Sequence, residues 1–312
     1  MILTVSLNPA VDKYIRLPRL ARGQHQQAEQ VVTSAGGKAV NVAGVLRELG
    51  EEVELIGFFG GFTGQYLARE IAAEGVHCHA IEIATLSRTA FVLVEEDGAE
   101  TEMVEPGGAV TAGEIAALRQ AVRAAAARAQ VIVLSGSAPP GCPDDIYLQL
   151  LADCAGRCPV IVDTSLAWLQ AVVDDTSGAA RPAMIKPNRR EAEAALGRTL
   201  ASPAAMAAAL RHLAARGIPM PIISDGAHGL HAWMDGAVWQ ARPPLLQRVN
   251  SVGSGDAAVA GFAAALARGA AAEAMLRLAA ACGAANVLTQ ECALVHRADV
   301  ERLLPQITVE RH

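Results

Sequence analysis

From about residue 107 onward, the sequence alternates between short apolar runs and longer runs rich in Ala and Leu. A short apolar run that ends on turn-forming residues is typical of a buried parallel strand. The longer runs have the length and composition of helices. This alternation predicts an α/β fold with a doubly wound, mostly parallel sheet flanked by helices. The expected strands lie at residues 129–137, 158–165, 183–188 and 219–226, and the expected helices at 112–129, 145–156, 189–197 and 203–217.

The first third of the chain contains strand patterns of two kinds. Residues 1–9 and 52–61 fit the same parallel sheet. Residues 13–37 and 87–108 instead carry strands and turns with no helix between them, and the second of these segments contains the hairpin signal "EEDGAE". These two segments predict a separate, smaller sheet.

We expect this smaller sheet to be antiparallel and to lie across the strand ends as a lid, formed from about residues 12–34 and 86–106. Ligands of doubly wound sheets bind beyond the carboxyl ends of the strands, so a lid there would cover the site. Its exposed edges would also offer a surface for a homodimer. The length of 312 residues suits one large α/β domain, 1–312, that carries this lid.

Charge and hydropathy limit the classes of function. The chain carries 26 basic and 32 acidic residues and no run of like charges, which argues against a nucleic-acid partner. No apolar run approaches the length needed to span a membrane, and the apolar segment at the N-terminus is too short for a signal peptide. We therefore expect a cytoplasmic protein whose partners are small molecules and other protein chains.

The six cysteines do not form a recognisable disulfide scaffold or zinc site. His77, Cys78 and His79 are explained by alternation along a strand, since zinc would need a fourth partner nearby. Cys154 and Cys158 have no second pair at matching spacing. We expect all six thiols to be reduced and no metal at these positions.

The stretch "NSVGSGDAAVAGF", at residues 250–262, is a glycine turn that leads into a buried helix. The N-terminus of such a helix presents free backbone N–H groups and a partial positive charge, which bind anions. Gly253, Ser254 and Gly255 would form that turn, with Asp256 directly after it. Asp256 could equally be a helix N-cap, because Asp is among the preferred capping residues.

Near the N-terminus, Asp12 follows the first strand, and Gly36, Gly37, Lys38 and Asn41 precede an amphipathic helix. Two glycines let the backbone approach a ligand closely, and a lysine there can meet a phosphate or a hydroxyl. The spacing is not that of a phosphate-binding P-loop, so an ordinary helix start remains the alternative.

Two further strand ends carry polar residues. Lys186 follows one strand and can neutralise phosphate charge, and Asn188 and Glu191 supply oxygens that suit Mg²⁺. The same two residues could simply cap a helix. After the next strand, Ser224, Gly226 and Gly229 form a glycine-rich exit suited to nucleotide phosphates.

The order of these motifs resembles the ribokinase-like (PfkB) carbohydrate kinase family. The resemblance extends over essentially the whole chain, through "GGK", "SGSAPPG", "VDTS", "KPNRRE", "SDGAHG" and "NSVGSGDAAVAGF". The opening "NPAVDKY" and the closing "LLPQI" are most similar to the 1-phosphofructokinases, with the tagatose-6-phosphate kinases and the minor 6-phosphofructokinases as near relatives.

The resemblance implies a role for each matching residue. The turn would be an anion hole for phosphoryl transfer, a reaction that depends on in-line positioning and charge stabilisation. The general base for the attacking hydroxyl would be Asp256. The remaining matches fall into three sets: sugar binding by Asp12, Gly37, Lys38 and Asn41, with Arg88 on the acceptor phosphate; ATP binding by Lys186, Ser224, Gly226 and Gly229; and Mg²⁺ binding, partly through water, by Asn188 and Glu191.

Four positions depart from the family pattern. Ala39 stands where the family usually has Gly, and Asp225 stands between the Ser and Gly of the nucleotide motif, where an apolar residue is common. Ala90 and Val104 replace lid asparagines that are frequent in 1-phosphofructokinases. The last two changes remove polar groups from the region that would select the sugar phosphate.

The sequence as a whole predicts an ATP- and Mg²⁺-dependent kinase that converts fructose 1-phosphate to fructose 1,6-bisphosphate. Tagatose 6-phosphate and fructose 6-phosphate remain alternative acceptors, and a monovalent-cation requirement stays open. A nicotinamide oxidoreductase is disfavoured, because "GGFTGQ" lacks the dinucleotide-binding glycine spacing. A non-catalytic sugar-phosphate sensor is a more distant alternative.

Overall fold

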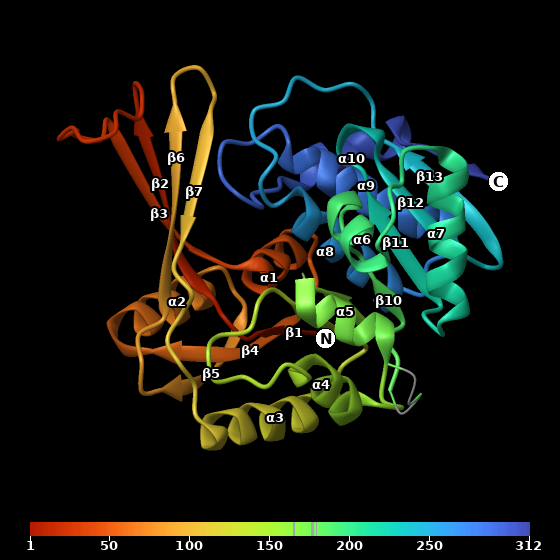
Figure 1. Cartoon of the computed structure of the whole chain (residues 1–312), viewed down its shortest axis with the longest axis horizontal. Helices are drawn as coiled ribbons and strands as arrows, with labels where there is room; N and C mark the ends of the chain where they lie inside the picture. The colour runs from red at the N-terminus through yellow and green to blue at the C-terminus, as the bar shows by residue number, and fades with distance from the viewer. Residues whose placement is uncertain (165, 176–177, 179) are drawn as a thin grey trace.

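The structure is a computed structural model that describes residues 1–164, 166–175, 178 and 180–312. Ser165, the last residue of the "VDTS" motif, lies outside them. The described strands form one ten-stranded sheet and one separate four-stranded sheet. Figure 1 shows the small sheet standing at one side of the large sheet and its helices.

The large sheet has the strand order β14-β13-β12-β11-β10-β9-β8-β1-β4-β5. Neighbouring strands from β5 to β11 pair in parallel, and β11 to β14 pair antiparallel at one edge. The strands are β1 (Ile2–Ser6), β4 (Val53–Gly60), β5 (His77–Ile83), β8 (Val131–Ser135), β9 (Val160–Asp163), β10 (Met184–Ile185), β11 (Met220–Ser224), β12 (Leu230–Met234), β13 (Ala237–Arg242) and β14 (Thr308–Arg311).

Helices cover both faces of the large sheet, as the three apolar clusters of the core show. One face packs against α1 (Lys38–Glu48), α2 (Gly61–Ala73), α8 (Ser254–Ala267), α9 (Ala272–Asn286) and α10 (Arg297–Leu303). The other face packs against α3 (Ala112–Ala126), α4 (Ile146–Cys154), α5 (Leu166–Asp174), α6 (Arg189–Leu196) and α7 (Pro203–Ala215). This is the predicted doubly wound α/β fold.

Alternation along each central strand explains why the sheet needs two helical layers. In β1, Ile2 belongs to the cluster on the α1 side, whereas Leu3 and Val5 belong to the cluster on the α3 side. Successive side chains of a strand point to opposite faces, so a strand that is apolar throughout must be buried on both. Helix α8 is buried almost along its whole length and includes Asp256 among its buried residues.

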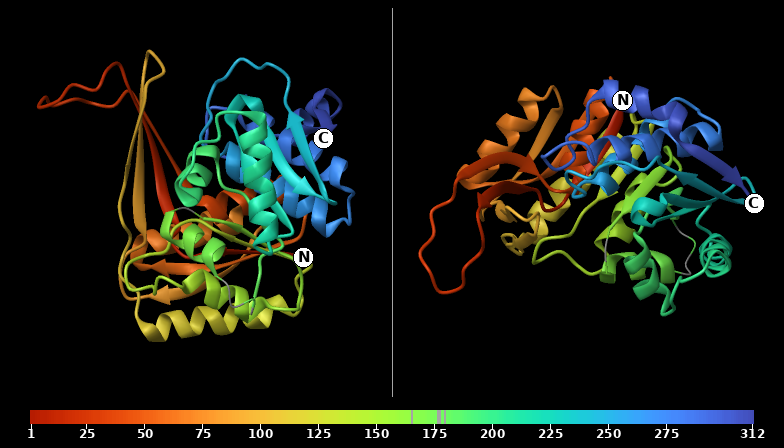
Figure 2. Two further views of the ribbon diagram at one scale, coloured as in Figure 1. Left: turned by 45° about the vertical axis from the view of Figure 1, so that its right-hand side comes forward. Right: turned by 90° about the horizontal axis from the view of Figure 1, so that it is seen from above.

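The small sheet has the order β3-β2-β6-β7 and contains β2 (Ala10–Leu17), β3 (Gln30–Gly36), β6 (Arg88–Glu95) and β7 (Glu100–Val104). Its central pair, β2 and β6, is parallel, so the expectation of a purely antiparallel sheet was wrong. The reason is topological: β2 follows β1 and β6 follows β5, and both leave the large sheet at its carboxyl edge in the same direction. Both turned views in Figure 2 show this sheet extending away from the body.

Most of the expected elements are present. All the strands and helices expected from residue 107 onward form, and the "EEDGAE" stretch joins β6 to β7 as a hairpin. The antiparallel edge formed by β12, β13 and β14 was not anticipated. His77, Cys78 and His79 begin β5, as expected from alternation.

Three further findings concern the cysteines, metal-binding side chains and membrane-spanning helices. The six cysteines are free thiols. No group of three or more metal-binding side chains occurs among the described residues. Within the same part of the chain, no helix is both long and apolar enough to cross a membrane.

Candidate active site

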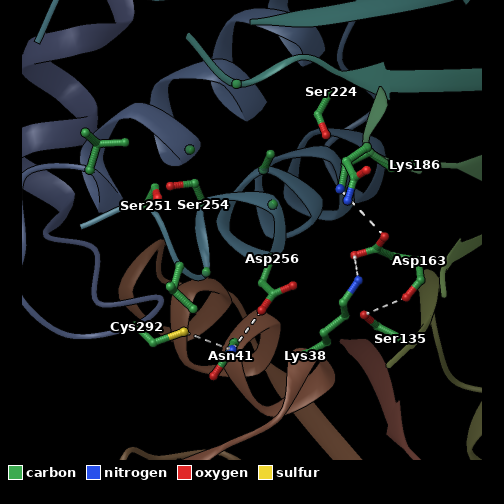
Figure 3. Close-up of a pocket in the computed structure, with 18 of the residues that line it drawn as sticks. Lys38, Asn41, Ser135, Asp163, Lys186, Ser224, Ser251, Ser254, Asp256 and Cys292 are labelled. Carbon is green, nitrogen blue, oxygen red and sulfur yellow. Dashed lines mark hydrogen bonds and ion pairs between the residues drawn. The ribbon is translucent and has the colours of Figure 1, made fainter. Parts of the chain in front are cut away.

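One cavity of about 800 Å³ is lined by every residue to which the family resemblance gives a role. Gly36, the first glycine of the "GGK" element, does not line it. It lies where the carboxyl ends of the large sheet, the start of α8 and the inner face of the small sheet meet. Residues from four distant parts of the chain therefore face one another, and Figure 3 shows several of them.

The glycine turn forms the N-terminus of α8. Gly253 is the N-cap, in the left-handed region with φ of 85°, and Asp256 is the third residue of the helix. No side chain caps this helix start, so the alternative that Asp256 is an N-cap is wrong. The Ser254 N–H donates to the backbone oxygen of Ser251 at 3.3 Å, whereas the N–H groups of Gly253, Gly255 and Asp256 have no such partner among the described residues and are left for a ligand. The helix dipole adds a partial positive charge there.

Asp256 is buried beside Asn41, whose Nδ2 donates a hydrogen bond of 2.7 Å to Asp256 Oδ2. Burial raises the pKa of Asp256 to about 6, although nearby Lys38 favours the ionised form. A carboxylate poised near neutral pH suits a general base, because it can accept a proton and release it again.

Two lysines point at a single buried carboxylate, Asp163, at the end of β9. Lys38 Nζ lies 3.6 Å from one carboxylate oxygen and Lys186 Nζ lies 3.6 Å from the other. The charge of Asp163 holds the pKa of Lys38 above its usual range. Figure 3 shows this arrangement, in which the carboxylate joins the lysine from the "GGK" element to the lysine from the "KPN" element.

The inner face of the small sheet supplies Asp12 and Arg88. Burial raises the pKa of Asp12 to about 7; Arg88 opposes this shift and Glu102 adds to it. The Arg88 guanidinium donates to the backbone oxygens of Asn8 at 3.1 Å and Glu105 at 3.3 Å. These bonds fix a cation at the base of the small sheet, where it can meet an anionic group of a ligand.

Asn188 and Glu191 form a complete capping box at the start of α6. Asn188 Oδ1 accepts from the N–H of Glu191 at 2.9 Å, and Glu191 Oε2 accepts from the N–H of Asn188 at 2.8 Å. The helix-capping alternative is therefore present in the structure. Mg²⁺ commonly keeps several waters and takes only one or two protein carboxylates, so Glu191, which lines the cavity, still fits a water-mediated metal site.

The glycine-rich exit of β11 is held close to β13. A Cβ atom at Gly229 would lie 1.9 Å from the backbone oxygen of Ala241, so only glycine fits there. The adjacent Asp225 faces Arg189, with 3.4 Å between a carboxylate oxygen and Nη1, and His228, with 3.4 Å to Nδ1. Asp225 does not line the cavity, and its ion pair with Arg189 accounts for an acidic residue at this position.

The other three departures differ in where they lie. Ala39, in α1, is fully buried and does not line the cavity, so its side chain does not narrow the cavity. Ala90 and Val104 do line the cavity, and they are paired across β6 and β7. They put two apolar side chains in the same row as Asp12.

Several lining residues were missed by the sequence interpretation. Asp163 was quoted only as part of a motif, although an acidic residue at the carboxyl end of a strand was a usable signal. Tyr14, Glu102 and Cys292 also line the cavity. Cys292 Sγ lies 3.5 Å from Asn41 Nδ2, a contact across 251 positions of sequence that no local pattern could indicate.

The chemistry of the cavity defines a class of enzyme. A helix N-terminus and two lysines favour a highly charged anion, and a buried carboxylate beside them favours removal of a proton from a hydroxyl. A doubly wound α/β protein with these groups at its strand ends is suited to phosphoryl transfer.

Comparison with known proteins assigns the family within that class. Residues 5–297 match the pfkB family of carbohydrate kinases. A 1-phosphofructokinase of Xanthomonas campestris pv. campestris is 38% identical over 266 residues, which span 85% of this chain and 83% of that protein. The chain therefore belongs to the pfkB family of carbohydrate kinases and is a phosphotransferase that acts on an alcohol group.

Solved structures agree with this assignment. Phosphofructokinase-2 of Escherichia coli, in complex with potassium, is 27% identical and matches with a TM-score of 0.91 over 97% of this chain and 98% of that one. Its complex with fructose-6-phosphate matches with a TM-score of 0.90 at the same identity and coverage.

Proposed function

We propose that this protein transfers the γ-phosphoryl group of ATP to fructose 1-phosphate and so forms fructose 1,6-bisphosphate. The observation that carries the proposal is the buried Asp256 directly after an uncapped helix N-terminus, in the same cavity as Arg88. The identity of 38% with a protein named as a 1-phosphofructokinase supports this acceptor.

Each group has a defined task in the reaction. Asp256 accepts the proton of the acceptor hydroxyl. The turn at Gly253, Ser254 and Gly255 stabilises the charge on the phosphoryl group in transfer, through the N–H groups of the two glycines and the hydroxyl of Ser254. Arg88 binds the phosphate that the acceptor already carries. Asp12, Gly37, Lys38 and Asn41 hold the sugar.

The nucleotide binds on the opposite side of the cavity, at Lys186, Ser224, Gly226 and Gly229. Glu191, with Asn188 beside it, would hold Mg²⁺ through water. The metal supplies neutralisation of charge on the phosphates. Lys186 adds a positive charge whose position is set by Asp163.

The small sheet acts as a lid and as the contact surface of a homodimer. Asp12, Ala90 and Val104 line the cavity, and strand alternation places Val31 and Met103 on the opposite face of the same sheet. Both of these apolar side chains are more than half exposed. An apolar outer face on a projecting sheet is suited to a second copy of the chain.

ADP release from MgATP tests the function directly. The assay compares fructose 1-phosphate, fructose 6-phosphate, tagatose 6-phosphate and free fructose, with Asp256→Asn as the blank. We expect the highest kcat/KM with fructose 1-phosphate and a loss of about 10²–10⁴-fold in kcat for the variant, which removes a general base. Turnover retained by Asp256→Asn would contradict the assignment of the base.

Fructose 6-phosphate is the second candidate acceptor, because the structurally similar Escherichia coli enzyme has been solved with that ligand. A preference for it would show that the apolar pair Ala90 and Val104 marks a different acceptor pocket. Thermal stabilisation by sugar phosphates without any ADP release would instead indicate a sensor.

A further inference from the structure

The glycine turn is held from behind by Asn286, the last residue of α9. The Asn286 side chain is fully buried, and its Nδ2 donates hydrogen bonds to the backbone oxygen of Val252 and to Ser254 Oγ, both at 2.9 Å. An amide nitrogen has two hydrogens, so both are used. The two acceptors flank Gly253, and one side chain therefore spans the turn.

The amide oxygen of Asn286 does not stabilise the fold. Oδ1 is buried and has no hydrogen-bond partner in the described part of the chain. A buried polar atom without a partner destabilises the folded state, and an apolar side chain at this position would avoid that loss. The surrounding stretch of α9 is mostly alanine, so packing alone does not require an amide here. The two donated bonds are what the asparagine provides.

The bond to Val252 also determines where the next N–H group points. A trans peptide is planar, and its C=O and N–H point in opposite directions. Because Asn286 holds the Val252 oxygen away from the cavity, the N–H of Gly253 is directed toward the cavity that Gly253 lines. The bond to Ser254 has a similar effect: Ser254 Oγ accepts from Asn286, so its own hydrogen remains free to donate.

We infer that Asn286 is a positioning residue for phosphoryl transfer, which aims the Gly253 N–H and the Ser254 hydroxyl at the group in transfer. The inference rests on the proposed function. Asn286 does not line the cavity and acts only through its hydrogen bonds to the turn. Loss of its two bonds should therefore affect the transition state more than the binding of either substrate.

The first variant is Asn286→Ala, assayed with whichever sugar phosphate the wild-type protein phosphorylates. We expect kcat to fall about 10²-fold, within the range for loss of a preorganised donor. The KM values for ATP and for the acceptor should stay within about twofold, because the residues that bind them are unchanged. The melting temperature should change little, since the variant also removes the unpaired Oδ1.

Thr289→Val is the matched control. Thr289 is also buried, and its hydroxyl has one hydrogen to donate, with the backbone oxygens of Asn286 at 2.9 Å and Leu294 at 2.8 Å as the acceptors within reach. It bonds to neither Val252 nor Ser254. Thr289→Val therefore tests whether the loss of any buried hydrogen bond in this segment lowers kcat. We expect Thr289→Val to lower the melting temperature more than Asn286→Ala and to lower kcat less.

Asn286→Asp adds a pH signature. The ionised carboxylate cannot donate to the Val252 oxygen and places a negative charge behind the turn, whereas the protonated form can donate one bond. Burial raises the pKa of a carboxyl group, so the ratio of variant to wild-type kcat should increase as the pH falls. A side chain that only fills space would give a ratio that does not depend on pH.

A third measurement does not depend on turnover. Binding of MgADP with aluminium fluoride, a mimic of the phosphoryl group in transfer, is measured by calorimetry for the wild-type protein and for Asn286→Ala. We expect the variant to bind MgADP alone normally and to lose at least about tenfold in affinity for the aluminium fluoride complex. Equal affinities, or kcat within twofold of wild type, would overturn the inference. A wild-type protein that shows this difference but phosphorylates another sugar phosphate and not fructose 1-phosphate would overturn the proposed function alone.

Discussion

Asp256 must be ionised to accept a proton from a hydroxyl, yet its burial favours the neutral form. Asn41 and Lys38 partly offset this, because a hydrogen bond to the carboxylate and a nearby positive charge both favour the ionised state. The balance leaves the pKa of Asp256 at about 6. The residue is therefore mostly ionised at neutral pH and is still basic enough to take up a proton.

This balance predicts a loss of activity in mild acid. As the pH falls through about 6, Asp256 becomes protonated and kcat/KM should fall about tenfold for each further pH unit. The measurement is kcat/KM from pH 5 to 8.5 at constant ionic strength. Stability should change in the opposite sense. Because the folded-state pKa is raised from 3.8 to about 6, the contribution of Asp256 to stability is lost as the pH rises from about 4 to about 6. An activity that is constant from pH 5 to 7 would contradict this prediction.

Asp163 is the second residue whose surroundings make a clear prediction. Its side chain is 1% exposed, and it carries the only negative charge within ion-pair distance of Lys186 among the described residues. Removing one partner of a buried ion pair leaves an uncompensated charge and costs about 3–5 kcal/mol. We expect Asp163→Asn to lower the free energy of unfolding by about this amount, measured by urea denaturation.

The double variant Asp163→Asn with Lys186→Met is the control for that measurement. It removes the buried positive charge as well, so it should be more stable than Asp163→Asn alone. Lys38, the other partner, is 36% exposed and can be solvated. If the double variant is less stable than the single one, the loss does not come from an uncompensated charge at Lys186.

At the scale of elements, the start of α8 depends on a residue without a side chain. A Cβ atom at Gly253 would lie 2.3 Å from the backbone nitrogen of Ala293 and 2.8 Å from Cys292 Sγ. Its φ of 85° adds about 1–2 kcal/mol of strain for any other residue. We expect Gly253→Ala to lose both more than 2 kcal/mol of stability and most of the activity, because the turn must move away from the segment behind it.

Gly98→Ala separates strain from close contact. Gly98 lies in the hairpin between β6 and β7 with φ of 82°, and no atom lies within 4 Å of the place where its Cβ would be. The same substitution there should cost only the strain of about 1–2 kcal/mol and should leave kcat unchanged. The prediction for Gly253 is contradicted if urea denaturation gives equal losses for the two variants.

The elements that the sequence predicted are those whose signals are local. The strand-helix alternation, the glycine turn before Asp256 and the hairpin between β6 and β7 each occupy one short stretch. The parallel pairing of β2 with β6 depends on where two distant segments leave the large sheet. The contacts of Asn286 with the turn likewise join residues more than 30 positions apart. Such contacts are set by packing and not by local pattern.

At the scale of the whole molecule, the small sheet has two faces with different surroundings. One face lines the cavity, and the other carries exposed apolar side chains although the sheet projects from the body. In β7, Glu102 and Val104 line the cavity, whereas Met103 lies between them on the outer face with 53% of its surface exposed. An outer face of this kind is stable in water when a second copy covers it.

The homodimer prediction is tested by a charge on that outer face. Val31, in β3, is 52% exposed, and Val249, in the connection before α8, is also 52% exposed. The two substitutions Val31→Asp and Val249→Asp thus introduce the same charge at equally exposed valines. Light scattering at micromolar concentration should show a dimer for the wild-type protein and for Val249→Asp, and a monomer for Val31→Asp, because a buried unpaired carboxylate opposes association. A monomeric wild-type protein, or a Val31→Asp variant that remains dimeric, would place the contact elsewhere or reject it.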